Sequence, residues 1–350
     1  MCSVPAYRDL LYDVIRNMPY ENEHFVKEKA EEYIAFWDHG QEEKLLRIYE
    51  DLLEILYEQG SFEEAKRRIR QMRASIAVGR STSRFESMPA GLLVGSSTGL
   101  PDKHACRVWG RYYYILGGYY DAVLDGAYAA QTPEETRLVR LFLKTVDQAI
   151  HWLSLSRDED SVLFLGECYR LKALLLIRTG MGRKKQIGSL LGKVRRLIDR
   201  YAEPDSKLER DCHMAMAWYY TYVEEDYPKT RSYMAKAMAI SARICKSELV
   251  QIDEQLSPVA NILLEWRRYD KAEQCLLRCI AICERHLVIL PYARRQMELL
   301  GHLLQVCLYA EKYDRCREII TEIDEKIGKI GGLQVEHYVP VEVRQALMQS

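Results

Sequence analysis

Residues 52–72 read LLEILYEQGSFEEAKRRIRQM, a pattern that recurs along the chain. Apolar residues at helical spacing come first, a break at Gly60 and Ser61 follows, and a second amphipathic helix pattern begins after it. Ser61 and Glu64 fit a capping box, in which the serine oxygen accepts a hydrogen bond from a free backbone N–H and the glutamate reaches back. Small Ala65 lets the two helices approach closely. The stretch therefore predicts an antiparallel helix hairpin.

Composition excludes several classes of protein. The chain has 350 residues, 48% of them apolar, and its 50 Lys and Arg nearly balance its 51 Asp and Glu. No global field therefore attracts nucleic acid or an anionic membrane. Ten cysteines without a paired spacing indicate buried free thiols in a reducing compartment. Charges at Arg8, Asp9 and Asp13 speak against a signal peptide or a membrane span. These features predict a soluble cytoplasmic protein.

Residues 1–40 predict an N-terminal pair of helices that is split at Met18 and Pro19, because proline disfavours continuation of the preceding helix. A helix-turn-helix that reads DNA is the alternative. Such a motif needs a basic second helix, but the second helix here carries more acidic than basic residues: Glu23, Glu28, Glu31 and Glu32 against Lys27 and Lys29. We therefore interpret this segment as a packing hairpin.

The first repeat covers residues 41–78, and a Gly-, Ser- and Pro-rich insertion covers 79–101. The insertion is interpreted as a mobile loop, with a lid or a regulatory segment as the alternative. Residues 106–130 then predict a second hairpin, in which Ala122 takes the place of Ala65. The interval between these two alanines shortens to 34 residues when the insertion is set aside.

Residues 102–330 continue the repeats, with one extra helix at 132–157 that has no matched partner. Further hairpins are predicted at 161–201, 207–245, 256–285 and 297–327, and residues 331–350 predict a C-terminal cap or tail. The residues that follow their turns in the place of Ala65 are Lys185, Thr230, Ala272 and Cys316. These positions lie 42 to 45 residues apart, so longer helices are expected.

The Leu-Gly, Tyr and small-residue pattern, with its 34-residue period, resembles the tetratricopeptide repeat over roughly residues 45–327. Ala65, Ala122 and Ala272 keep the small residue, whereas Lys185 and Cys316 depart from it. The resemblance implies an all-α, right-handed α-solenoid of antiparallel helix hairpins that holds another molecule. The longer repeats also look like the helical sensor arms of bacterial regulators, including peptide-pheromone receptors.

In tetratricopeptide arrays the first helix of each hairpin lines a concave groove, about 18, 15, 11 and 8 residues before the small residue. This resemblance selects a set of candidate groove residues: Arg107, Arg111, Tyr114, Arg170, Arg178, Tyr219, Tyr222 and Asn261. Arginine, tyrosine and asparagine suit peptide recognition. Any single aromatic is better explained by core packing. Arg107 and Arg111, one helical turn apart, are harder to explain in that way.

Other patterns predict no chemistry. Cys275, Cys279, Cys283 and His286 share one helical face but spread over more than about 12 Å along it, too far to bind one zinc ion. Residues 188–194 fail the phosphate-loop spacing, and the motifs His-Glu-x-x-His and Gly-x-Ser-x-Gly are absent. We therefore expect no catalytic residue, no metal site and no cofactor.

A basic run between Arg178 and Arg200 is the best nucleic-acid candidate, because Lys193, Arg196 and Arg200 share a helical face. A solvated outer face is favoured, since the net charge is near zero and no stacking aromatics interrupt the run.

The sequence thus predicts a non-enzymatic scaffold that binds a protein or peptide segment, for which acidic residues would suit the arginines. One alternative is a ligand- or peptide-sensing regulatory arm of a bacterial signalling or transcription system. A third is an enzyme whose site the sequence does not reveal. The sequence does not determine the partner or the oligomeric state.

Overall fold

A computed structural model describes most of the chain, and all regular structure in the described residues is helical. The described residues are 10–15, 23–35, 37, 41–59, 61–78, 102–126, 133–156, 158–244, 252, 256–286, 290–330, 338–339 and 341–349. The predicted insertion at 79–101 and Gly60 lie outside them. The chain divides into two compact units, Met1–Ala202 and Glu203–Ser350.

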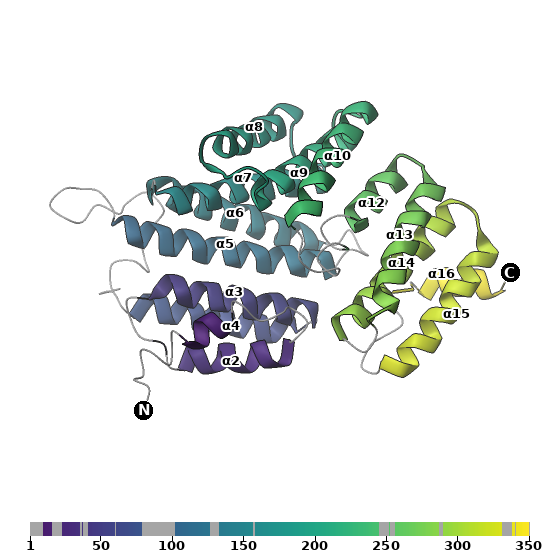
Figure 1. Cartoon of the computed structure of the whole chain (residues 1–350), viewed down its shortest axis with the longest axis horizontal. Coiled ribbons are helices and arrows are strands. Elements are labelled where there is room, and N and C mark those ends of the chain that lie inside the picture. Colours follow the sequence, from purple (N-terminus) through teal and green to yellow (C-terminus); the bar gives the residue numbers. More distant parts are fainter. Residues whose placement is uncertain are drawn as a thin grey trace. The chain divides into compact units, whose positions relative to one another are not determined.

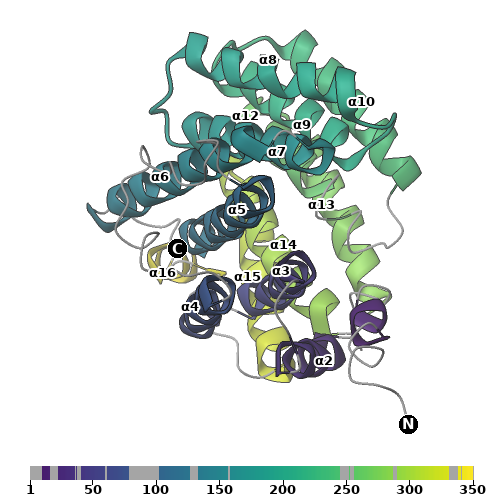
Figure 2. The ribbon, with the colours of Figure 1, turned by 90° about the vertical axis from the view of Figure 1, so that its left-hand side faces the viewer.

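Unit 1 is a stack of helix hairpins in which each helix packs on the next along the chain (Figures 1 and 2). After α2, the hairpins are α3/α4, α5/α6 and α7/α8. Their bounds are α2 (Glu23–Ala35), α3 (Glu42–Glu58), α4 (Phe62–Val78), α5 (Lys103–Gly126), α6 (Pro133–Ser156), α7 (Glu159–Arg178) and α8 (Lys184–Tyr201). The first helices of successive hairpins, α3, α5 and α7, also contact one another.

Unit 2 continues the same architecture with three hairpins and a terminal helix. The hairpins are α9/α10, α12/α13 and α14/α15, and α16 packs on α15. Their bounds are α9 (Lys207–Tyr222), α10 (Tyr227–Ile244), α12 (Ser257–Glu265), α13 (Tyr269–Glu284), α14 (Leu290–Tyr309), α15 (Tyr313–Ile330) and α16 (Val341–Gln349). The all-α array of helix hairpins predicted from the sequence is confirmed.

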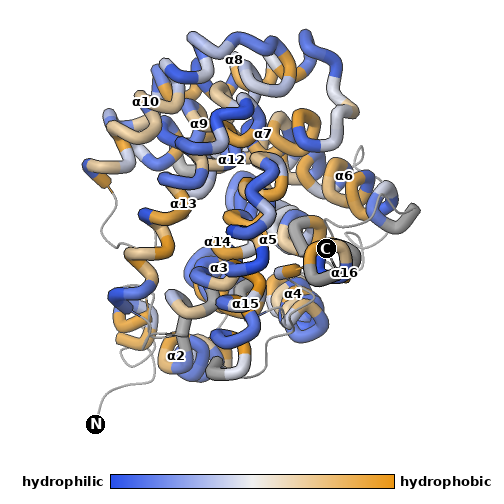
Figure 3. Tube along the Cα trace, turned by 90° about the vertical axis from the view of Figure 1, so that its right-hand side faces the viewer, coloured by the Kyte–Doolittle hydropathy of each residue, from blue (hydrophilic) through white to orange (hydrophobic). Residues whose placement is uncertain are grey.

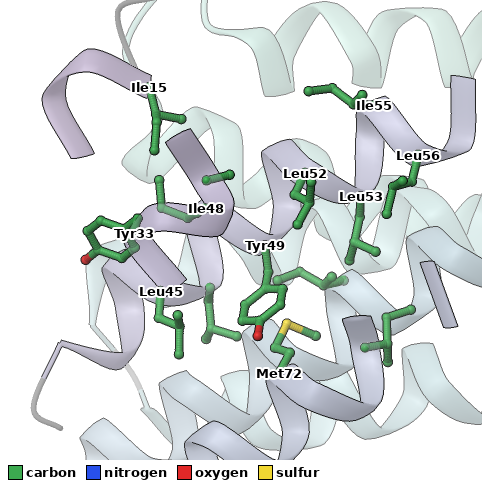
Figure 4. Close-up of a cluster of buried hydrophobic side chains, with 14 of the residues drawn as sticks. Ile15, Tyr33, Leu45, Ile48, Tyr49, Leu52, Leu53, Ile55, Leu56 and Met72 are labelled. Carbon is green, nitrogen blue, oxygen red and sulfur yellow. The ribbon is translucent and has the colours of Figure 1, made fainter. Parts of the chain in front are cut away.

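The hairpin at residues 52–72 is present as predicted. The apolar stripe of α3 is buried against α4, where Ala65 and Met72 are fully inaccessible to solvent. The backbone N–H of Ser61 donates to the Leu56 carbonyl over 2.8 Å and closes the turn. Figure 4 shows the core around this hairpin, in which Tyr49 and Leu53 are buried among aliphatic side chains. Each fully buried leucine contributes about 1.5–3 kcal/mol relative to an exposed one.

The second hairpin differs from the prediction, because α5 is one continuous helix that includes Ala122. Its partner is α6, the helix that the sequence left unmatched; α6 begins at Pro133. The glycines explain the difference. A Cβ on Gly110 would lie 2.6 Å from Cγ of Leu153, and one on Gly117 would lie 3.5 Å from Phe142. These glycines therefore let α6 approach α5 closely and do not form a turn.

The turns of the later hairpins share a residue in the left-handed backbone region. The φ angles are 64° at Gly180, 54° at Glu225, 52° at Arg267 and 58° at Glu311. In unit 2 the second helix begins two residues after this position. As a result Thr230, Ala272 and Cys316, the predicted residues after the turns, are all fully buried.

The turn between α7 and α8 is two residues longer, and the prediction for Lys185 is wrong there. Helix α8 begins at Lys184, and Lys185 is exposed. The buried residue at the corresponding helical position is Ile187. A Cβ on Gly182 would lie 2.7 Å from Leu176 and 2.8 Å from Ile187, so glycine allows the longer turn to pack against both helices.

Candidate ligand-binding face

The predicted groove residues fall into two separate groups. Five of them lie on α5 and α7 in unit 1 and three lie on α9 and α12 in unit 2. The first group comprises Arg107, Arg111, Tyr114, Arg170 and Arg178; the second comprises Tyr219, Tyr222 and Asn261. We call the surface formed by α3, α5 and α7 the first-helix face.

Arg111 lies at the centre of the first-helix face and is only 3% exposed. Its Nη2 lies 3.1 Å from Oε2 of Glu50 on α3, and its guanidinium carbon lies 4.4 Å from the centroid of the Phe164 ring on α7. Burial lowers the pKa of Arg111, and the carboxylate of Glu50 opposes that shift. Since an arginine keeps its charge in proteins, Arg111 forms a charged link between three helices.

Arg107 forms a second link, one helical turn before Arg111. Its guanidinium pairs with Glu43 of α3, and its Nη1 lies 3.5 Å from Oδ1 of Asp158. Asp158 is the N-cap of α7: it accepts from the backbone N–H of Ser161 over 2.9 Å and from the hydroxyl groups of Ser161 and Ser156. Burial alone would raise the pKa of Asp158, but these hydrogen bonds and Arg107 hold it below its usual range.

Arg170 and Arg178 of α7 are partly exposed and also paired. Nε of Arg170 donates to Glu167 over 2.7 Å, and Nη2 of Arg178 donates to Asp121 of α5 over 2.9 Å. Tyr114 packs edge-on against Phe164, with ring centroids 5.5 Å apart. Burial raises the pKa of its phenol well above the usual value.

Each predicted arginine of the first-helix face therefore has a carboxylate from this chain. The sequence analysis missed these partners, which are Glu43, Glu50, Asp121, Asp158 and Glu167. Four of the five lie more than 50 residues away from the arginine they pair with. The signal that could have found them is the alternation of charge between successive first helices, since α3 is acidic and the start of α5 is basic.

The three residues in unit 2 differ in exposure. Tyr219 is 7% exposed, and its hydroxyl donates to Glu224 over 2.5 Å. Tyr222 is 38% exposed and stacks on Trp218, with ring centroids 5.2 Å apart. Asn261 is half-buried on α12, which packs on α9. Tyr222 and Asn261 are the two that retain solvent-accessible surface beyond that of a core residue.

Two further features bear on chemistry. Among the described residues no group of three or more His, Cys, Asp or Glu is placed to hold a metal ion. Cys279 and Cys283, from the cysteine row on α13, are buried, and burial raises the pKa of the half-buried Cys275 thiol. Within the described ranges, no helix combines the length and apolarity needed to cross a membrane.

Comparison with known proteins supports the fold. No protein-family model and no curated sequence matches the chain. The crystal structure of a Rap protein complexed with competence and sporulation factor is similar, with a TM-score of 0.56 and 12% identity over 99% of this chain and 86% of that chain. At this identity the likeness concerns the fold alone. The chain thus adopts a tetratricopeptide-like helical-repeat fold similar to that of the Rap protein.

Proposed function

We propose that the chain is a non-enzymatic scaffold of the cytoplasm that binds a protein or peptide segment in a groove lined by the first-helix face. In this proposal Arg107, Arg170 and Arg178 give hydrogen bonds, and Tyr114 and Arg111 shape the floor of the groove. Tyr219, Tyr222 and Asn261 form a second contact area in unit 2.

The carrying observation is the row of linked polar side chains that runs across three successive first helices. Arg107, Arg170 and Arg178 keep 26%, 16% and 25% of their side-chain surface exposed while their guanidinium groups are held by carboxylates. Side chains fixed in this way lose little conformational entropy when a ligand binds. The similar Rap protein, whose structure contains competence and sporulation factor, adds support from its fold.

The pairing also indicates how a partner is recognised. An acidic partner would have to compete with the carboxylates that already neutralise these arginines, for example Glu43 and Asp158. A peptide backbone needs no such competition, because its carbonyl oxygens accept hydrogen bonds from N–H groups that the carboxylates leave free. We therefore propose recognition by hydrogen bonds and aromatic contact, with little dependence on net charge.

A selection experiment tests the proposal. A random peptide library displayed on phage is selected on the full chain, and fluorescence anisotropy gives the affinity of the enriched peptides. We expect Arg107→Gln and Arg178→Gln each to weaken binding by about tenfold, the value of a hydrogen bond to a charged donor. The matched control is Arg140→Gln on α6, an exposed arginine away from the first helices. Equal affinity for all three variants would contradict the proposed face.

A second candidate function is a sensing arm whose hairpins shift when a ligand binds. The link between Asp121 and Arg178 and the link between Glu43 and Arg107 each join neighbouring first helices. A ligand that competes for these arginines would change the spacing of the hairpins. Small-angle X-ray scattering with and without an enriched peptide tests this, since an unchanged scattering profile supports the rigid scaffold.

A further inference from the structure

Helix α8 carries the densest positive charge among the described helices. Its sequence KKQIGSLLGKVRRLIDRY has six Lys and Arg against one Asp. The apolar side is buried in unit 1 through Ile187, Leu190, Leu191, Val194 and Ile198. All the lysines and arginines of α8 are exposed. The helix therefore presents its charge outward.

Four of these cations form one stripe. Lys185, Lys193, Arg196 and Arg200 lie within an arc of about 80° at about 100° per residue, and they span about 22 Å along the axis at about 1.5 Å per residue. We call them the α8 stripe. The hydrophilic segments of α8 alternate with hydrophobic ones in Figure 3, as expected for a helix with one buried side.

The α8 stripe differs from the first-helix face in its electrostatics. None of its four cations has a carboxylate within ion-pairing distance among the residues that the structure describes, whereas the neighbouring Arg195 pairs with Asp199 over 2.8 Å. The only printed contacts of the stripe are aromatic: Lys193 lies 4.7 Å from the Tyr169 ring centroid and Arg200 lies 5.2 Å from that of Tyr201. Like charges one turn apart weaken a helix by about 0.2–0.5 kcal/mol per pair, so the fold gains nothing from this arrangement.

The centre of the exposed face is open as well as charged. Gly188 and Gly192 lie on the same side of α8, next to the stripe. A Cβ on Gly192 would meet only Nη1 of Arg196, at 3.7 Å. Another backbone can therefore approach α8 closely between its basic side chains.

We propose that the α8 stripe docks an acidic helix of a partner protein. The spacing of eight, three and four residues is that of one helical face, so a partner helix with Asp or Glu every three or four residues presents carboxylates at the same repeat. The two glycines make room for such a helix. One helix face is smaller than the about 800 Å² per partner of a stable interface, so this contact is transient and sensitive to salt.

Nucleic acid is the competing occupant. Two observations favour the acidic helix. The net charge of the chain is −1, which gives no long-range attraction for a polyanion. Tyr201, at 38% exposure, is the one aromatic side chain of α8, whereas single-stranded nucleic acid binds on successive aromatic platforms. The proposal goes beyond the proposed function, because it concerns a second helix and not the first-helix face.

Fluorescence anisotropy on the full chain tests the proposal. The probe is a labelled alanine-rich helical peptide of about 20 residues with glutamates along one face, compared with its glutamine counterpart, a DNA duplex and a single-stranded RNA of similar length. The test variant is Lys185→Gln with Arg196→Gln and Arg200→Gln. The matched control is Arg137→Gln with Arg140→Gln and Lys144→Gln, which removes the same charge from exposed, unpaired positions on α6. Circular dichroism confirms that both variants fold.

We expect the wild-type chain to bind the glutamate peptide and not the glutamine peptide, and the α8 variant to lose about tenfold or more in affinity at low salt. The α6 control should change it less than about twofold, and affinity should fall between about 50 and 200 mM salt. Equal loss in both variants, no binding of the glutamate peptide, or α8-dependent binding of DNA or RNA alone would each overturn the proposal. A library-selected peptide should keep its affinity for the α8 variant, which separates this result from the proposed function.

Discussion

The guanidinium of Arg111 and the carboxylate of Glu50 form an ion pair, 3.1 Å from Nη2 to Oε2, that joins the first helices of two successive hairpins. Arg111 is almost fully buried, whereas Glu50 keeps 29% of its side-chain surface exposed. The pair lies beside the Phe164 ring of the third hairpin. A residue predicted as part of a binding groove thus also holds three hairpins together.

This pair should contribute measurably to stability. Arg111→Ala leaves a cavity and an unpaired carboxylate, so we expect it to lower the free energy of unfolding by about 2–4 kcal/mol, somewhat less than for a fully buried pair because Glu50 is partly hydrated. Arg111→Met keeps most of the volume and should cost less. A double-mutant cycle with Glu50→Gln, measured by urea unfolding, should give a coupling of about 1–3 kcal/mol. A coupling within about 0.3 kcal/mol of zero would contradict the structural role of the pair.

The glycines of α5 offer a matched pair of substitutions. Gly110→Ala places a Cβ against the Leu153 side chain and 3.2 Å from its backbone nitrogen, so overpacking should destabilise the chain by about 1–3 kcal/mol. Gly118→Ala meets nothing within 4 Å and should stabilise the helix by about 0.5–1 kcal/mol. Thermal unfolding followed by circular dichroism measures both. Effects of the same sign would show that α6 does not approach α5 at Gly110.

Asp158 should make the stability of unit 1 depend on acid. Its pKa is lowered in the folded state, so its contribution is present above the unfolded pKa of about 3.9 and is lost as the pH falls through the folded value. Asp158→Asn keeps a capping side chain but loses the charge that faces Arg107, so the loss of stability on acidification should become less steep. Asp158→Ala also loses the cap and should cost about 1 kcal/mol more at neutral pH. Urea unfolding at a series of pH values from 7 downward tests this. Identical acid profiles for the wild type and Asp158→Asn would refute it.

Buried tyrosines should limit stability at high pH. Burial raises the pKa of Tyr49 to about 12 and that of Tyr112 to about 12, which lie above the usual value of 10.0. Because the neutral phenol is favoured in the folded state, their contribution is complete below about pH 10 and is lost as the pH rises towards 12. Phenolate absorbance should therefore rise together with the loss of helicity. Tyr49→Phe should flatten the alkaline limb of the stability curve, and an unchanged limb would argue against this burial.

The sequence by itself determined the hairpins and most of their turns. Helical periodicity and capping depend on residues three or four apart, which is why the hairpin at 52–72 and the turn before Ala272 lie where the pattern predicts. The small residue after a turn is equally local. It failed at Lys185, where two additional turn residues shift the register so that Ile187 is buried instead.

Only the tertiary structure decided which helix packs on α5 and what its polar side chains contact. Gly117 and Gly118 look like a break in sequence, but the approach of α6 turns the glycine-containing helix into a continuous packing surface. The carboxylates that meet Arg107 and Arg111 lie on a neighbouring hairpin, more than 60 residues earlier in the chain. Contacts of this kind depend on how hairpins stack, and no local pattern encodes that. The same stacking leaves the cations of the α8 stripe unpaired, because α8 turns them towards solvent and its buried side carries only apolar residues into the core.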